Sequence, residues 1–165
     1  MKDLLAVCPL FAGLTPDEAE IFEPCTHRIK AAAGSLLMEA GKACEAIFYV
    51  LEGDVIVRVE DETSAPTMVE VLPAGSLVGW SALVPPHAAT ASLSCITDSV
   101  LLRLDGAELR RLCEAHPRAG YRVLLNLASV ISDRLATARS RYAALLNRTK
   151  GQAHGGGVRP NDPVA

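Results

Sequence analysis

Short apolar segments rich in β-branched residues alternate with glycine-containing turns through the middle of the chain. Short strands separated by frequent turns favour an antiparallel sandwich or barrel. Gly34, Gly41 and Gly53 stand in the turns, where glycine supplies the positive φ angle that tight turns need. We expect strands at residues 26–32, 34–38, 46–51, 55–59, 67–72, 90–94 and 99–104, with a polar hairpin tip at 61–66.

Helical patterns flank these strands on both sides. Near the N-terminus, Thr15 is predicted to cap a short helix, and Glu18 three residues later completes a capping box. After the strands, Asp105 is predicted to cap another helix, and a longer helix begins near Pro117. We therefore expect one domain with N-terminal helices in 1–25, a β-roll in 26–104 and C-terminal helices in 105–147.

The long helix carries the most regular apolar pattern of the chain. Its apolar residues recur at alternating spacings of four and three, which is a heptad seam. They are Leu124, Ala128, Ile131, Leu135, Ala138, Tyr142 and Leu145. Such a stripe packs either on its own barrel or on a second copy of the chain. The 3.5-residue repeat favours a homodimer through these residues.

The same helix is basic. Between residues 117 and 150 there are seven arginines and lysines and a single acidic residue, Asp133. Charge runs of this kind are usually solvated helix faces. The alternative is a docking surface for an acidic partner or nucleic acid.

Composition places the chain among ordinary globular domains. Half of its 165 residues are hydrophobic and the formal net charge is −3, so there is enough apolar surface for one core and no overall signature of nucleic-acid binding. The five cysteines are scattered and odd in number, which predicts free thiols in a reducing compartment. No segment approaches the roughly 20 apolar residues of a membrane span, and residues 1–5 lack a signal-peptide core. We expect a cytoplasmic protein.

The most informative stretch runs from Gly75 to Cys95. It combines a strand end, a glycine turn, one helical turn, a proline stop and a new strand, so that N–H groups at the start of the helical turn suit an anion. The order Gly-x-x-x-Gly-x-x-Ala-Leu and then Pro-x-Ala-Ala-Thr resembles the phosphate-binding cassette of cyclic nucleotide-binding domains. These domains occur in the cAMP receptor protein (Crp/Fnr) family and in protein kinase A regulatory subunits. The resemblance implies a mainly β fold, an antiparallel jelly-roll β-barrel with N-terminal helices and a long C-terminal dimerisation helix, with the cassette at 75–91.

The resemblance also implies a set of ligand-binding positions. They are Val78, Gly79, Trp80, Ser81, Ala82, Leu83, His87, Ala88, Ala89 and Thr90. Where the family carries a Glu that binds the ribose 2′-hydroxyl this chain has Trp80, and where it carries an Arg that pairs with the cyclic phosphate this chain has His87. Each lost charge-assisted contact is worth roughly 1.5–3 kcal/mol, so affinity for cAMP or cGMP should fall by about two orders of magnitude or more. Trp80 either fills the vacated pocket or stacks on a ligand.

These observations favour a non-catalytic regulatory or sensor module. The sequence contains no nucleophile elbow, no Walker-type loop and no Cys/His spacing typical of a metal site. We expect weak or absent binding of cAMP or cGMP, or of another small ligand, with the signal passing through the helices after Asp105. In the family the long helix can also supply a residue that stacks on the base, and the candidates here are Tyr121, Leu124 and Asn126.

Two further expectations concern partners. Transcription regulators of the family continue into a helix-turn-helix domain, whereas this sequence ends in a polar, glycine-rich segment at 148–165 that we expect to be a flexible tail. Direct DNA binding and a membrane partner are therefore not expected, and neither is a metal. The alternative to a sensor is a degenerate pocket that no longer binds cyclic nucleotides, in a protein that acts as an interaction scaffold. Less favoured is a transcription regulator that depends on a partner to read DNA.

Overall fold

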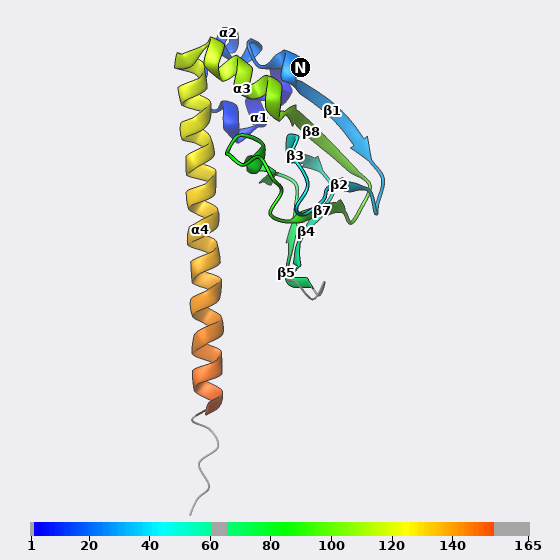
Figure 1. Cartoon of the computed structure of the whole chain (residues 1–165), viewed down its shortest axis with the longest axis vertical. Coiled ribbons are helices and arrows are strands. Elements are labelled where there is room, and N and C mark those ends of the chain that lie inside the picture. The colour runs from blue at the N-terminus through cyan, green and yellow to red at the C-terminus, as the bar shows by residue number, and fades with distance from the viewer. Residues whose placement is uncertain (1, 61–65, 154–165) are drawn as a thin grey trace, which may run out of the picture. The chain divides into compact units, whose positions relative to one another are not determined.

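The computed structural model describes residues 2–60 and 66–153 (Figure 1). Short helices come first, and two longer helices follow the strands. They are α1 (Lys2–Val7), η1 (Pro9–Phe11), α2 (Pro16–Glu20), η2 (Glu23–Cys25), α3 (Gly106–Ala115) and α4 (Pro117–Ala153). The predicted hairpin tip, apart from residue 66, and the part of the predicted tail after residue 153 lie outside the described residues.

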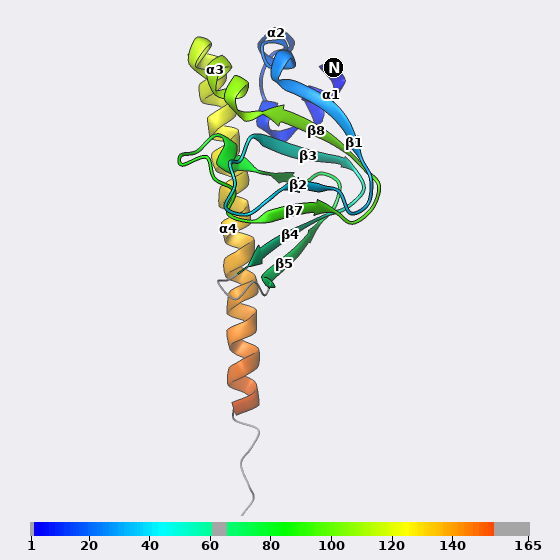
Figure 2. The ribbon, with the colours of Figure 1, turned by 45° about the vertical axis from the view of Figure 1, so that its right-hand side comes forward.

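The described strands form two four-stranded antiparallel sheets, ordered β1-β8-β3-β6 and β2-β7-β4-β5. Their bounds are β1 (Thr26–Ala31), β2 (Leu36–Met38), β3 (Ala46–Glu52), β4 (Val55–Glu60), β5 (Pro66–Leu72), β6 (Leu77–Val78), β7 (Ser92–Cys95) and β8 (Ser99–Asp105). Figure 2 shows β1, β8 and β3 side by side, with β2, β7, β4 and β5 in the second sheet. The predicted mainly β fold of the jelly-roll type is confirmed, although β7 begins two residues later than expected.

The core lies between the two sheets. Phe48 and Val50 on β3, Val55 on β4, Leu93 on β7 and Leu101 on β8 are all buried in one cluster. Burial extends over three consecutive residues of β3, namely Ala46, Ile47 and Phe48, because α3 contacts β3 and β8. A central strand that is buried on both faces has a continuous run of apolar residues in its sequence, and β3 shows this pattern.

The N-terminal helices are held by specific hydrogen bonds. The predicted capping box is present, since the Glu18 N–H donates to Thr15 Oγ1 at 3.3 Å and the Thr15 N–H donates to Glu18 Oε2 at 3.0 Å. The side-chain amide of Asn126, near the start of α4, donates to the carbonyls of Leu10 and Ala12, each at 2.9 Å. These two bonds fasten the segment around η1 to the first turns of α4.

Helix α4 begins at Pro117 as predicted but ends at Ala153, six residues beyond the expected end at 147. The start of the predicted tail is therefore helical. Arg148, Lys150 and Gln152 are good helix formers, and the single Gly151 costs only about 1 kcal/mol in a helix interior. By compactness the chain divides after Ala128, so the later part of α4 forms a unit of its own.

The predicted seam of α4 is largely exposed. Leu124 and Leu135 are 47% and 49% exposed, and Tyr142 is 65% exposed. Ala128 and Ala138 are also exposed, Ile131 is partly buried, and the side chain of Leu145 lies outside the described residues. The stripe is therefore an apolar surface that this single chain does not cover.

All five cysteines are free, as predicted. Burial raises the pKa of the Cys8 thiol to about 12 and that of Cys25 to about 11. None of the helices in the described part of the chain is long and apolar enough to cross a bilayer.

Candidate functional site

The cassette begins with a tight turn at Gly79. Strand β6 ends at Val78, Gly79 has φ = 84°, and the 3-10 helix η3 (Trp80–Ala82) follows at once. A Cβ atom at position 79 would lie 2.6 Å from the carbonyl oxygen of Ala46, so the backbone of β3 approaches too closely for any side chain. The predicted glycine turn and single helical turn are confirmed. Position 79 requires glycine for two reasons, its positive φ angle and the close approach of β3.

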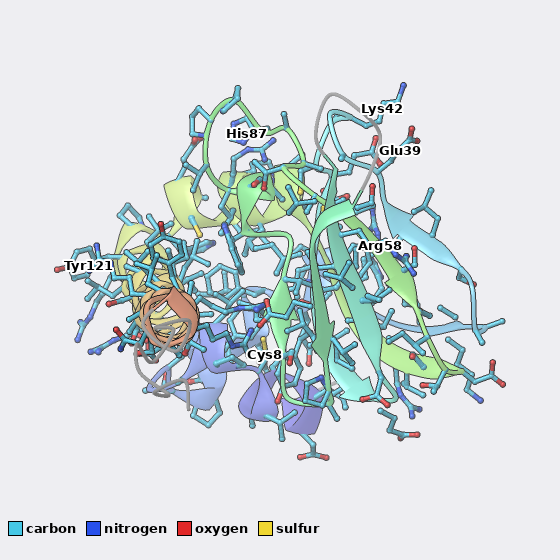
Figure 3. The ribbon with its side chains drawn as sticks, turned by 90° about the horizontal axis from the view of Figure 1, so that it is seen from below. Cys8, Glu39, Lys42, Arg58, His87 and Tyr121 are labelled. Atoms are coloured by element: carbon cyan, nitrogen blue, oxygen red, sulfur yellow. The ribbon has the colours of Figure 1, made fainter. Side chains whose placement is uncertain are left out.

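The second half of the cassette pairs with the segment before β3. The N–H of Cys44 donates to the His87 carbonyl at 2.7 Å, and the N–H of Ala89 donates to the Lys42 carbonyl at 2.8 Å. Ala43 and Ala88 form an antiparallel bridge between these two bonds. Figure 3 shows the loops that carry His87 and Lys42 at the same end of the roll. The cassette is therefore fixed to residues 42–44 through its backbone.

The thiol of Cys44 adds a side-chain contact to this junction. Its Sγ lies 3.4 Å from the Gly79 carbonyl and 3.5 Å from the sulfur of Met38, and the residue is buried. Desolvation raises the pKa of the Cys44 thiol, which is therefore protonated at neutral pH and donates to the carbonyl. Cys44 belongs to the packing of the cassette.

His87 occupies the position where the family has an arginine. Its backbone has φ = 58°, a left-handed conformation that costs a non-glycine residue about 1 kcal/mol or more. The ring Nδ1 lies 3.4 Å from the carbonyl oxygen of Ser81, so the imidazole turns back toward η3. A carbonyl can only accept, so this contact uses the Nδ1–H of the ring, whereas an arginine would offer a permanent charge and a bidentate fork.

Arg110 is a residue of this region that the sequence pattern did not reveal. It lies on α3, and its guanidinium Nη1 donates a hydrogen bond to the carbonyl of Ala82 at the end of η3. Beside it, the Gly106 N–H donates to the Glu45 carbonyl at 2.7 Å, and a Cβ at Gly106 would lie 2.8 Å from that of Ala82. The first turns of α3 therefore rest directly on the cassette.

The predicted ligand-binding residues divide by burial. Val78, Ala82, Leu83 and Ala89 are buried and contribute to packing. Thr90 is exposed, and the remaining positions are partly exposed, namely Gly79, Trp80, Ser81, His87 and Ala88. A ligand that approaches the cassette meets this second group.

The three stacking candidates on α4 differ in their surroundings. The amide of Asn126 is used in its bonds to Leu10 and Ala12, so this residue has a structural role. Tyr121 is 65% exposed, and Figure 3 shows it pointing away from the roll. Leu124 is about half exposed and belongs to the seam. Among the described residues, no group of three His, Cys, Asp or Glu side chains is arranged to hold a metal ion.

The two facing antiparallel sheets, the glycine-framed cassette and the helices that follow define a β-roll ligand-binding domain. The chain belongs to the cyclic nucleotide-binding domain family, whose model matches residues 28–116, more than half of the chain. Glutaminase 1 of Bradyrhizobium diazoefficiens is 32% identical over 144 residues, which cover 86% of this chain. The match takes in only 22% of that protein's length.

Solved structures give the same fold. A putative cyclic nucleotide-binding protein from Geobacter metallireducens superposes with a TM-score of 0.71 at 22% identity, covering 81% of this chain and 97% of that one. The catabolite activator protein of Thermus thermophilus gives a TM-score of 0.67 at 26% identity, covering 83% of this chain and 62% of that one. The resemblance identified in the cassette therefore extends over the roll and its helices.

Proposed function

We propose that this chain is a non-catalytic regulatory module that binds a small anionic ligand of the cyclic-nucleotide class at its cassette and transmits occupancy through α3 and α4. The observation that carries the proposal is the direct contact between cassette and helix. Ala82, the last residue of η3, accepts a hydrogen bond from Arg110 and packs against Gly106. A ligand that shifts η3 must therefore also shift the start of α3.

The cassette supplies backbone donors for the ligand. The N-terminus of a helix favours an anion, and η3 begins at Trp80 in the position where the family binds phosphate. The charged partners of the family are absent, because Trp80 and His87 replace Glu and Arg. We therefore expect affinity for cAMP and cGMP to be weak, with selectivity that depends on Trp80.

In this proposal the chain forms a homodimer, and ligand occupancy is transmitted through the dimer interface. The residues from Leu124 to Leu145 have the spacing of a dimer seam, those whose burial is described are largely exposed, and a second copy of α4 would cover them. A ligand that binds one arrangement of the helices more tightly then shifts the population of dimer conformations. The five free thiols suit a reducing compartment such as the cytoplasm.

Calorimetric titration of the full chain with cAMP and cGMP tests the proposal, with 5′-AMP as the acyclic control. We expect saturable binding of a cyclic nucleotide and none of 5′-AMP. A double variant, Trp80→Glu with His87→Arg, should raise cAMP affinity by about 100-fold or more, because it restores two charge-assisted contacts. The absence of binding in both proteins would overturn the assignment of the cassette as a nucleotide site.

The second candidate is an interaction scaffold with a degenerate pocket. It is favoured by one observation, the turning of the His87 ring toward the Ser81 carbonyl in place of a permanent cation at the phosphate position. If the protein is a scaffold, neither nucleotide should produce heat of binding or a shift in the unfolding temperature, in the wild type or in the double variant. The titration therefore separates the two candidates.

A further inference from the structure

A cavity lies in the roll beside the segment that holds the cassette. Its volume is about 130 Å³, and its apolar lining comes from Leu37, Met38, Ala43, Ala46 and Phe48. Glu45 and Arg103 complete the lining, and none of these residues belongs to the cassette. The cavity is bounded by β2 of one sheet and by β3 and β8 of the other.

The placement of Arg103 is unusual for a charged residue. In the β3–β8 register Arg103 lies directly opposite Phe48, and paired residues point to the same face of a sheet. Phe48 belongs to the buried core, so Arg103 stands on the core-facing side of β8. Inward-pointing charges often protect the edge strand of a sheet, but β8 is paired on both sides. Protection of an edge therefore does not account for Arg103.

The guanidinium of Arg103 has one partner among the described residues, Asp105. Its ion pair with Asp105 is long, with 3.7 Å between Nη1 and Oδ2, and the Arg103 side chain is 30% exposed. The other carboxylate oxygen of Asp105 accepts the N–H of Glu108 at 3.0 Å and caps α3, which holds the carboxylate in place. Within the described residues the guanidinium donates no hydrogen bond to the protein, although it has five donors.

We propose that this cavity binds a small organic monocarboxylate, with the carboxylate on Arg103 and the apolar tail against Met38 and Phe48. A cavity of about 150 Å³ holds one benzene molecule, so the present one suits a ligand of about six non-hydrogen atoms. A nucleotide is far too large for it. Glu45 at the wall repels each negative charge of a ligand, so the repulsion is smaller for a monocarboxylate than for a dicarboxylate or phosphate.

Butyrate is a suitable probe, and butyramide is its uncharged match. Amide chemical shifts of the full chain, labelled with ¹⁵N, should move saturably with butyrate in the millimolar range, which is the affinity that so small a ligand can reach. The shifts should centre on Ala43, Ala46 and Phe48. Butyramide should bind at least about fivefold more weakly, since it lacks the charge-assisted bond to the partly exposed Arg103.

Two arginine variants decide the role of Arg103. Arg103→Gln should weaken butyrate binding at least about fivefold. Arg28→Gln is the matched control, because Arg28 lies on neighbouring β1 opposite Leu102, on the other face of the sheet, and is exposed. It should leave butyrate binding unchanged. Saturable shifts that survive Arg103→Gln, or no saturable shifts with butyrate at all, would overturn the proposal.

The test of the cavity can succeed or fail separately from the test of the cassette. Butyrate binding without cAMP binding would support the cavity site while the nucleotide proposal fails, and cAMP binding without butyrate binding would do the reverse. Ala43→Leu gives a second check, because position 43 is exposed and a larger side chain there narrows the cavity without disturbing the core. We expect this variant to fold and to lose butyrate binding.

Discussion

Arg110 of α3 donates a hydrogen bond from its guanidinium to the main-chain carbonyl of Ala82, the last residue of η3. The two residues are 28 positions apart in sequence, and Ala82 is completely buried. Carbonyls at the end of a helix lack partners within it, so a cation in this position satisfies one and also complements the helix dipole. A helix outside the roll is thereby bonded to the segment that would contact the ligand.

Replacing Arg110 with Met should lower the free energy of unfolding by about 1–2 kcal/mol, because the Ala82 carbonyl loses a charged donor while the aliphatic packing is kept. Urea denaturation measures this loss. Arg111→Met is the matched control on the same helix. Arg111 is exposed and, within the described part of the chain, bonds only to Glu108, at 2.6 and 2.8 Å, so its loss should change stability much less. Equal effects of the two substitutions would contradict the coupling role of Arg110.

Two glycines with similar backbone conformations should respond differently to alanine. Gly75 has φ = 91° and open space around it, so Gly75→Ala should cost only the backbone term of about 1 kcal/mol. Gly79→Ala meets the Ala46 carbonyl in addition and should cost about 2–4 kcal/mol. Thermal and urea unfolding of both variants checks the difference. Equal losses of stability in the two variants would show that the backbone of β3 moves to make room for the added methyl group.

Much of this architecture follows from local sequence patterns. The capping box at Thr15, the cap at Asp105 and the glycine turns were predictable because each depends on residues close together in the chain. The cassette was recognisable for the same reason, since its glycines and small residues lie within one short stretch. Neither the register of the strands nor the backbone conformation of the cassette was needed to recognise it.

The features that escaped prediction depend on contacts between distant elements. Arg110 lies on a helix that was predicted from its cap at Asp105, but its bond to Ala82 requires the packing of α3 on the cassette. In the sequence, Arg103 is an ordinary polar residue within a predicted strand. Only the pairing of β8 with β3, which sets Arg103 opposite Phe48, places it beside the cavity. Asn126 was a candidate for ligand stacking until the structure showed its bonds to the N-terminal segment. The extension of α4 past residue 147 was missed because Gly151 resembles a stop signal.

The protein should lose stability at alkaline pH. Burial raises the pKa of Cys8 to about 12 and that of Cys25 to about 11, from an ordinary value of 9.0. The folded state therefore favours the protonated thiols, so their contribution is complete below about pH 9 and is lost as the pH rises toward 11–12, by about 1.4 kcal/mol per pH unit for each thiol.

Urea denaturation at several pH values from about 8 to about 11 measures this slope. The double variant Cys8→Ala with Cys25→Ala should show a shallower decline. Some slope should remain, because burial also raises the pKa of Cys113 and of Tyr49. An unchanged slope in the double variant would show that other groups cause the alkaline loss.

Charge placed in the seam of α4 should prevent self-association. Leu135→Glu introduces a carboxylate at a position predicted to face the second copy, so sedimentation should change from dimer to monomer. Ala136→Glu is the control, since residue 136 is exposed on the same helix but lies outside the heptad seam. It should leave the dimer intact. A wild-type chain that sediments as a monomer would contradict the dimer proposal.

Residues 43–46 form a strip that contacts both the cassette and the cavity. On one side this strip holds the cassette, through the Cys44 bond to His87 and the close approach of Ala46 to Gly79, and on the other side it lines the cavity. The Glu45 carbonyl also anchors the first residue of α3. Because thermodynamic linkage is reciprocal, a ligand at either proposed site that displaces this strip would change the affinity for a ligand at the other site by the same factor. With both proposed sites in use, the domain would report a comparison of two chemical signals.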